Sequence, residues 1–206
     1  MNSIKFVYFD IGNVLLLFQG GLQKMADKHG KTYSDFEKVF RKYDDLVCRG
    51  GMSSQELWHK YEEEIGIHED DFNFADYWID CCIPIKEVFE LVQHLHTHGL
   101  RVGLLSNLYT DIYSVILKKN LFPFTSWDAK VISSEIKMAK PDVEMYAMAE
   151  QRAGVAPQEI LFIDDKQDFL NPAIQRGWKT FLFDPTNPKE SVSNLEKVLS
   201  RYHVLT

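Results

Sequence analysis

Polar side chains that could do chemistry lie at four places in the sequence, most of them where an apolar stretch ends. In chain order they are Asp10, Ser106 with Asn107, Lys140, and Asp164 with Asp165. If the fold brings them together, three carboxylates, a hydroxyl, an amide and an ammonium group suit a divalent metal ion and a phosphate group. Because the candidate metal ligands are oxygen atoms, and not histidine or cysteine, they favour Mg²⁺ over Zn²⁺.

Each of these places also has a purely structural explanation. A single Asp or Ser after a strand is common in turns. Lys140 precedes Pro141, so it could be a solvated residue ahead of a helix whose first position is proline. Asp164 and Asp165 could simply start a helix, where carboxylates are favourable. All four features in one chain, in this order, nevertheless favour a functional site.

The segments that must position these groups are short and apolar, and they alternate with amphipathic stretches. Five of them predict strands, at residues 4–10, 100–105, 129–133, 159–163 and 179–183. Helical periodicity occurs at residues 85–98, 111–119, 142–153, 169–176 and 189–202. Apolar strands that alternate with helices predict an α/β fold, a doubly wound Rossmann-like parallel sheet covered on both faces. Ligands bind outside the carboxyl ends of the strands in such a sheet, so we expect the polar groups there.

Residues 18–84 break this alternation. They predict helices at 22–29, 34–47, 53–65 and 70–81, and no strand. Ser53 and Glu56 have the spacing of a capping box at the start of the third helix. A helical block inserted after the first strand of an α/β sheet is typical of a lid. We therefore expect a core domain made of residues 1–17 and 85–206, with an all-helical cap domain at 18–84.

The composition argues against several classes of function. The 206-residue chain carries 30 acidic and 23 basic side chains, a net charge of −7, and lacks the Lys/Arg cluster that nucleic acid requires. Its longest apolar run, residues 4–18, is too short to cross a bilayer, and its central carboxylate argues against a signal peptide. The cysteines are odd in number, with Cys81 and Cys82 adjacent, which argues against a disulfide framework. We expect a cytoplasmic monomer or weak homodimer that binds neither nucleic acid nor membranes.

Four motifs resemble those of the haloacid dehalogenase superfamily. They are Phe9-Asp10-Ile11-Gly12-Asn13-Val14, Leu105-Ser106-Asn107, Met138-Ala139-Lys140-Pro141-Asp142 and Phe162-Ile163-Asp164-Asp165. The resemblance extends over essentially the whole chain, including the helical cap after the first motif. Within the superfamily, the chain is similar to the α-D-glucose-1-phosphate phosphatase branch and to the phosphatase domain of soluble epoxide hydrolases. The resemblance implies a Mg²⁺-dependent phosphatase that hydrolyses a small phosphorylated metabolite, with sugar phosphates as the expected substrates.

The resemblance assigns the nucleophile and the metal ligands. Asp10 would attack phosphorus and form an aspartyl-phosphate. The other oxygen of Asp10, the backbone carbonyl of Gly12 and the carboxylate of Asp165 would hold Mg²⁺. The metal ion would let an anionic nucleophile approach an anionic phosphate.

The resemblance also assigns the groups around the phosphate. Ser106, Asn107 and Lys140 would bind the phosphoryl oxygens. Lys140 would in addition neutralise charge on the transferred group, which makes it part of the catalytic machinery. Asp164 and Asn13 would have supporting roles, with Asp164 orienting Lys140 or a metal-bound water.

Two positions depart from the pattern of the superfamily's phosphatases. Most of them have a second Asp two residues after the nucleophile, which serves as general acid and base; here that residue is Gly12. Without this carboxylate, esters with poor leaving groups are expected to react slowly, so sugar 1-phosphates should be better substrates than 6-phosphates. Phe169 stands where related sequences usually have Asn or Asp, which removes a polar partner from the metal site.

Two alternative functions stay open. A 2-haloacid dehalogenase would also use Asp10 as nucleophile and tolerates Gly12, but it needs no metal, so the acidic pair at 164 and 165 argues against it. A catalytically silent protein that binds a phosphorylated ligand or a partner is favoured by Gly12 and Phe169. Arg49, in a glycine-containing turn of the cap, is a further candidate for contact with a sugar.

Overall fold

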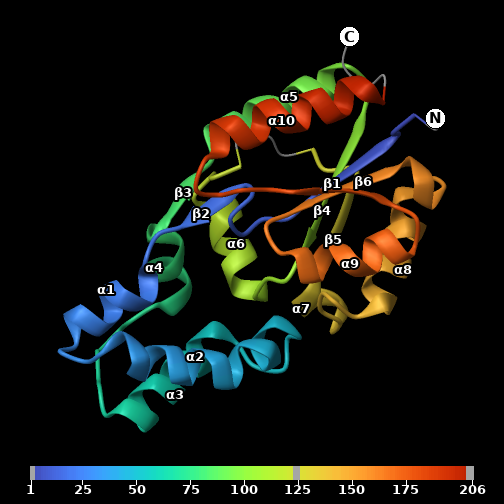
Figure 1. Cartoon of the computed structure of the whole chain (residues 1–206). Helices are drawn as coiled ribbons and strands as arrows, with labels where there is room; N and C mark the ends of the chain where they lie inside the picture. The colour runs from blue at the N-terminus through green and yellow to red at the C-terminus, as the bar shows by residue number, and fades with distance from the viewer. Residues whose placement is uncertain (1–2, 123–125, 203–206) are drawn as a thin grey trace.

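The computed structural model describes residues 3–122 and 126–202 of the chain. Its centre is a five-stranded parallel sheet in the order β5-β4-β1-β6-β7 (Figure 1). The strands are β1 (Phe6–Phe9), β4 (Arg101–Ser106), β5 (Ala129–Ile132), β6 (Ile160–Asp164) and β7 (Lys179–Leu182). All five lie at the segments predicted from the sequence, with bounds that differ by one or two residues. The predicted α/β fold with a doubly wound parallel sheet is confirmed.

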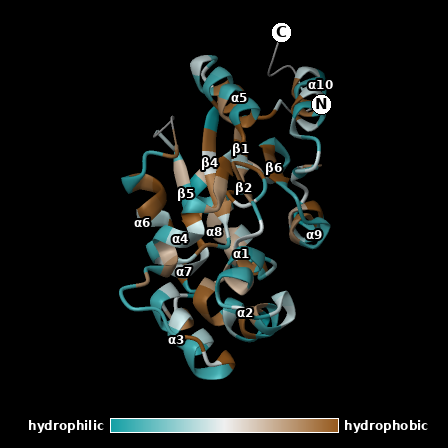
Figure 2. Cartoon of the chain, turned by 90° about the vertical axis from the view of Figure 1, so that its left-hand side faces the viewer, coloured by the Kyte–Doolittle hydropathy of each residue, from teal (hydrophilic) through white to brown (hydrophobic). Residues whose placement is uncertain are grey.

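Side chains of β1 alternate between the two faces of the sheet, and both faces are covered. Val7 and Phe9 belong to one apolar cluster, and Phe6 and Tyr8 to the other. The first cluster includes residues of α5 (Lys86–Thr97), α6 (Thr110–Lys118) and α10 (Pro188–Arg201), and the second includes residues of α8 (Val143–Ala153) and α9 (Gln167–Gln175). Figure 1 shows α5 and α10 side by side, and β1 and β6 carry the hydrophobic colour in Figure 2. Burial on both faces explains why residues 6–9 are apolar without interruption.

Four helices inserted between β1 and α5 form the cap, as the sequence predicts. They are α1 (Gly21–Lys28), α2 (Tyr33–Cys48), α3 (Ser54–Ile65) and α4 (Phe74–Asp80), and Figure 1 shows them as a separate layer. Tyr61 is fully buried at the centre of the cap, where its ring centroid lies 5.0 Å from that of Phe36 and 6.1 Å from that of Phe74. The cap therefore has an aromatic interior of its own.

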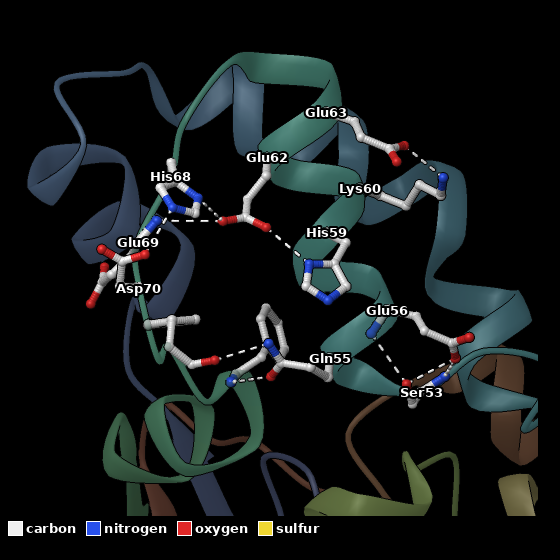
Figure 3. Close-up of polar contacts among 12 residues, drawn as sticks. Ser53, Gln55, Glu56, His59, Lys60, Glu62, Glu63, His68, Glu69 and Asp70 are labelled. Atoms are coloured by element: carbon white, nitrogen blue, oxygen red, sulfur yellow. Dashed lines mark hydrogen bonds and ion pairs between the residues drawn. The ribbon is translucent and has the colours of Figure 1, made fainter.

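Polar contacts fix α3 and tie the following loop to it (Figure 3). The hydroxyl of Ser53 accepts a hydrogen bond from the backbone N–H of Glu56, and the Glu56 carboxylate accepts one from the backbone N–H of Ser53, at 3.1 and 2.7 Å. This is the predicted capping box. The amide of Gln55 donates to the carbonyl of Phe72 at 2.9 Å and accepts from the N–H of Phe74 at 3.3 Å. The start of α4 is thereby held against α3.

The structure differs from the sequence prediction at both ends of the cap. β2 (Leu16–Phe18) and β3 (Cys82–Pro84) pair as an antiparallel two-stranded ribbon, so the expectation that residues 18–84 contain no strand is wrong. Strands of three residues are too short for an alternating pattern to reveal them. The fourth helix begins at Phe74, and not at residue 70, because the side chain of Asn73 accepts a hydrogen bond from the N–H of Asp76 at 2.9 Å.

The core has two further short elements, α7 (Ser133–Ile136) and a 3₁₀ turn at Pro157–Glu159, which the sequence did not predict. Within the described part of the chain, no helix is long and apolar enough to cross a membrane.

Gly103 marks the tightest packing in the middle of the sheet. It lies in β4, where it pairs with Tyr8 of β1 on one side and with Ala129 of β5 on the other. A Cβ atom at this position would lie 2.7 Å from the carbonyl oxygen of Ala129 and 2.9 Å from the ring of Phe6. Both neighbours belong to the sheet or its core, so a side chain here would force strands apart.

We therefore expect Gly103→Ala to lower the free energy of unfolding by about 1–3 kcal/mol, the usual cost of overpacking a core. Denaturant-induced unfolding followed by circular dichroism measures this change. Gly21→Ala is the matched control, because the new Cβ would meet the Trp78 ring at an ordinary 3.5 Å in the first turn of α1. Equal stability of the two variants would contradict the packing argument.

Candidate active site

Three adjacent strands deliver polar residues to one edge of the sheet. Asp10 directly follows β1, Ser106 ends β4 and Asp164 ends β6, and these strands are neighbours in the order β4-β1-β6. All three residues are buried, as is Lys140 from the loop between α7 and α8. The structure therefore brings together the residues that the sequence predicts for the site.

The ammonium group of Lys140 lies between two carboxylates. Its Nζ is 3.1 Å from Oδ2 of Asp10 and 2.5 Å from Oδ2 of Asp164, and its side chain is fully buried. Burial alone would lower the pKa of Lys140, but the charges of Asp10 and Asp164 outweigh it and raise this pKa, so the group stays an ammonium. The alternative that Lys140 is a solvated residue ahead of a helix is therefore wrong.

Burial also affects the carboxyl group of Asp164. It raises the pKa of Asp164 to about 7, an effect that the charge of Asp10 increases and that of Lys140 opposes. Asp164 does not start a helix, since it is the last residue of β6 and its Oδ1 accepts a hydrogen bond from the N–H of Lys166 at 2.8 Å. Its two oxygens thus have one partner each, Lys140 and the following loop.

Phe169 covers the ammonium group of Lys140. The ring centroid of Phe169 lies 4.9 Å from the Nζ of Lys140, and that of Phe162 lies 5.3 Å from it. Aromatic faces attract a cation at these distances. The departure from the family pattern at position 169 therefore gives Lys140 a neighbour that keeps water away from it.

Asn107 holds the backbone of Lys140. Its Oδ1 accepts a hydrogen bond from the N–H of Lys140 at 2.7 Å, and its Nδ2 donates one to the Lys140 carbonyl at 2.9 Å. Both ends of the amide are thus engaged, so the side chain of Asn107 positions Lys140. The hydroxyl of Ser106, in contrast, is buried without a hydrogen-bond partner among the described residues. Buried hydroxyls normally have a partner, which leaves this one available to a ligand.

Three carboxylates lie close enough to share one metal ion. Oxygen atoms of Asp10, Asp164 and Asp165 all lie within 4.8 Å of one another. Asn13 orients the third, since its Nδ2 donates to Oδ2 of Asp165 at 3.0 Å. Asn13 has a φ of 56°, a left-handed conformation that asparagine tolerates better than most residues. Oxygen donors of this kind suit Mg²⁺.

Gly12 lies against the ring of Phe18. A Cβ at Gly12 would be 3.0 Å from Cε2 of Phe18, so this ring takes the space beside the position where related phosphatases have their second Asp. Phe18 comes from β2, whose pairing the sequence did not reveal. The first motif therefore lacks the acid, and a side chain at position 12 would require the Phe18 ring to shift.

A cavity of about 270 Å³ separates these groups from the cap. Asp10 and Asp165 lie on its core side, and its cap side is lined by Phe18, Phe40, Asp44, Cys48 and Trp78. These cap residues were not identified as site residues from the sequence. One signal was present, because residues 40, 44 and 48 are spaced by four and lie along one face of α2.

Arg49 connects the cap to the loop of Lys140 and does not line the cavity. Its guanidinium group binds Asp142 through both terminal nitrogens, with Nη2 3.2 Å from Oδ1, and also binds Asp45 at 2.9 Å. Asp142 in turn accepts a hydrogen bond from the N–H of Ala139 at 3.2 Å. The expectation that Arg49 reaches a sugar is therefore wrong, because its donors are used at the junction of cap and core.

The fold is a parallel α/β sheet with a helical cap, and its site has an aspartate after the first strand and a lysine between two carboxylates. These features define a hydrolase of the haloacid dehalogenase type. The chain belongs to this family: the model of the haloacid dehalogenase-like hydrolases matches residues 4–168. The resemblance read from the four motifs is thus confirmed at the level of the family, and the protein is a hydrolase.

Individual relatives are distant and differ in activity. The chain is 22% identical over 161 residues to the pyrimidine 5′-nucleotidase YjjG of Escherichia coli (strain K12), a match covering 72% of this chain and 71% of that protein. It is 24% identical over 135 residues to the (S)-2-haloacid dehalogenase of Pseudomonas putida, covering 64% and 52%. The fold is shared with the haloacid dehalogenase family enzyme bt-2542 of Bacteroides thetaiotaomicron, crystallised with magnesium and inorganic phosphate. That comparison has a TM-score of 0.73 and 23% identity, and covers 89% of this chain and 96% of the other.

We expect Lys140→Met to lower the free energy of unfolding by about 3–5 kcal/mol at neutral pH in the absence of divalent metal, because two buried carboxylates lose their shared counter-charge. Urea unfolding in the presence of a chelator measures the effect. Lys166→Met serves as the control, because this exposed lysine contacts the Phe169 ring at 5.0 Å and forms no ion pair with a described residue. If both variants unfold like the wild type, Lys140 does not hold the carboxylates together.

Proposed function

We propose that the protein is a Mg²⁺-dependent phosphatase that hydrolyses small phosphorylated metabolites, and sugar phosphates in particular, through an aspartyl-phosphate on Asp10. The observation that carries this proposal is the position of Lys140 between Asp10 and Asp164, beside the third carboxylate of Asp165. A nucleophile, a fixed cation and a cluster of metal ligands at one point are what phosphoryl transfer requires. The proposal includes the predicted cytoplasmic location and a monomeric or weakly dimeric state.

The residues present fit a magnesium ion. Asp10, the backbone carbonyl of Gly12 and Asp165 would hold it, and the cluster of carboxylate oxygens has the hard donor chemistry that Mg²⁺ selects. When bound, the ion supplies positive charge between an anionic nucleophile and an anionic phosphate. The complex of bt-2542 with magnesium and inorganic phosphate supports this assignment, since that enzyme has the same fold.

The protein groups hold the nucleophile and the phosphate in place. The N–H of Ile11 donates to Oδ1 of Asp10 at 2.7 Å and Lys140 binds Oδ2, so the carboxylate has one orientation. Lys140 is fixed in turn by Asp164 and by the Asn107 side chain. The unpartnered hydroxyl of Ser106 would donate to a phosphoryl oxygen. Such preorganised donors stabilise the transition state without rearrangement during the reaction.

The glycine at position 12 favours sugar 1-phosphates as substrates over other sugar phosphates. No carboxylic acid follows Asp10 in the first motif, and the Phe18 ring fills the adjoining space. General acid catalysis is typically worth about 10²–10⁴-fold, so a site without this acid favours esters whose alcohol leaves readily. An anomeric hydroxyl is a better leaving group than an ordinary alcohol, which favours the 1-phosphates.

A second candidate is a 2-haloacid dehalogenase, which the relative from Pseudomonas putida brings into consideration. The substrate of such an enzyme carries a carboxylate. Among the described residues that line the cavity, three are acidic and Lys166 is the one basic residue. A cavity with this charge balance binds a carboxylate poorly unless a metal ion compensates, so we place this function second.

A phosphatase assay with p-nitrophenyl phosphate and a panel of sugar phosphates, in the presence of Mg²⁺, tests the proposal. Asp10→Asn is expected to abolish turnover while leaving the fold intact, because the amide has nearly the same shape but is not an anionic nucleophile. Beryllium fluoride should label wild-type Asp10 as a phosphate mimic and should fail on the variant. Turnover by Asp10→Asn within a few-fold of the wild type would eliminate Asp10 as the nucleophile.

The metal assignment makes its own prediction. Asp165→Ala should raise the Mg²⁺ concentration needed for half-maximal rate by about tenfold or more, because a direct ligand is lost. Titration of the rate with Mg²⁺ measures the shift. Asp168→Ala removes an exposed carboxylate three residues further on and should leave the titration unchanged. If the Asp165 variant also titrates like the wild type, the metal is bound elsewhere.

A further inference from the structure

Asp44 is a charged residue on the cap side of the active-site cavity. The residues that the cap and its ribbon contribute to the lining are otherwise aromatic, apart from Cys48. Because Asp10 and its neighbours occupy the core side, a phosphate would lie there and the remainder of the substrate would face Asp44. The chemistry of Asp44 therefore bears on which esters the cavity accepts, a conclusion that rests on the proposed phosphatase function.

Hydrogen bonds hold Asp44 as an acceptor. Its Oδ1 accepts from the Tyr109 hydroxyl at 2.6 Å and faces the Cys48 thiol at 3.7 Å. Burial, and next to it the Asp44 charge, raises the pKa of both Tyr109 and Cys48, so both groups keep their protons and donate. No described residue donates to Oδ2 of Asp44. That oxygen is free to accept a hydrogen bond from a substrate hydroxyl.

No described basic residue of the cap forms an ion pair with Asp44, and Lys166 is the one basic residue among the described residues of the lining. Arg49, the next basic residue along α2, is bound to Asp142 and Asp45. Lys166 reaches the cavity from the core, where it is exposed and lies over the Phe169 ring at 5.0 Å. A second anionic group that lies against the cap would therefore meet the Asp44 carboxylate, which is unfavourable at short range.

Aromatic rings form the rest of this wall. The Trp78 ring lies with its centroid 5.7 Å from that of Phe18. It is nearly parallel to the rings of Phe40 and Phe74, whose centroids are 5.9 and 5.5 Å away. Flat apolar surfaces with a few polar groups suit a ring that has C–H faces and hydroxyl edges. The cavity volume of about 270 Å³ also lies just below the range of ~300–1,000 Å³ usual for drug-sized ligands.

We propose that Asp44 selects the substrate: its free oxygen binds a hydroxyl of an uncharged sugar or polyol that lies against the aromatic wall, and its charge excludes monoesters that carry a second anionic group. The substrate class is then a neutral, hydroxylated monophosphate. Sugar acid phosphates, phosphorylated carboxylic acids and bisphosphates are rejected at the cap.

A matched pair of esters tests this role. α-D-Glucose 1-phosphate and α-D-glucuronate 1-phosphate have the same ring and leaving group and differ by one carboxylate. With Mg²⁺, the wild type should have a kcat/KM at least about tenfold higher for the glucose ester, the size of effect expected for like charges a few ångströms apart. Asp44→Asn should bring this ratio to within about threefold of unity, mainly through a gain on the glucuronate ester.

Glu37→Gln is the matched control, because it removes the same charge from the same helix at an exposed ion pair with Arg41. It should keep the wild-type ratio. A purely structural role of Asp44 would lower the rate on both esters and leave the ratio unchanged, which would overturn the proposal. Asp44→Ser is the second variant should Asp44→Asn fail to fold.

Two wild-type results separate this inference from the proposed function. No hydrolysis of p-nitrophenyl phosphate or of any phosphate ester with Mg²⁺ would mean that the protein is not a phosphatase. Hydrolysis of p-nitrophenyl phosphate together with a preference for the glucuronate ester, or with no activity on either sugar, would leave the phosphatase function intact and overturn the role of Asp44.

Discussion

The ammonium group of Lys140 and the carboxylates of Asp10 and Asp164 are each costly to bury alone. The ammonium group compensates the charge of both carboxylates. β1 and β6 are adjacent and parallel, so their carboxyl ends place two carboxylates on either side of one cation. A buried charge network is stable only when all its members are in place. The surrounding structure keeps Lys140 in place. The Asn107 side chain is hydrogen-bonded to the Lys140 backbone, and the Phe169 ring lies over the Lys140 ammonium group.

The same constraint links the cap to the chemistry. The loop of Lys140 continues to Asp142, which is bound by Arg49 from the end of α2. Earlier in the core chain, Tyr109 follows the Ser106-Asn107 motif and binds Asp44, again on α2. The cap helix α2 and the residue that follows it therefore contact both of the loops that carry the proposed phosphate-binding groups. The position of the cap and the order of the site are therefore linked through these two contacts.

The features that could be predicted from the sequence are those that depend on residues close together in the chain. Asp10 and Asp164 were identified because an apolar strand ends at a carboxylate, and the order of the motifs placed them at one edge of the sheet. The roles of Phe18, Arg49 and Asp44 could not be predicted, because they depend on where the cap lies. Phe18 meets Gly12 only through a ribbon of three-residue strands, and the partner of Arg49 is distant in the chain. Asp44 shares a face with Phe40, but helical spacing alone does not say what that face meets.

The ribbon of β2 and β3 brings the two ends of the cap segment together. The chain leaves the core at Leu16 and returns at Pro84, and these two residues are paired across the ribbon. Segments whose ends lie together can be inserted or exchanged with little effect on the domain that carries them. Substitution of the segment between the two strands would replace Asp44 and Trp78 while Asp10, Lys140 and Asp164 stay in the core domain, provided that the new segment supplies a partner for Asp142 in place of Arg49. In a chain built this way, the residues that the cap contributes to the cavity can change while the charged residues of the core are kept.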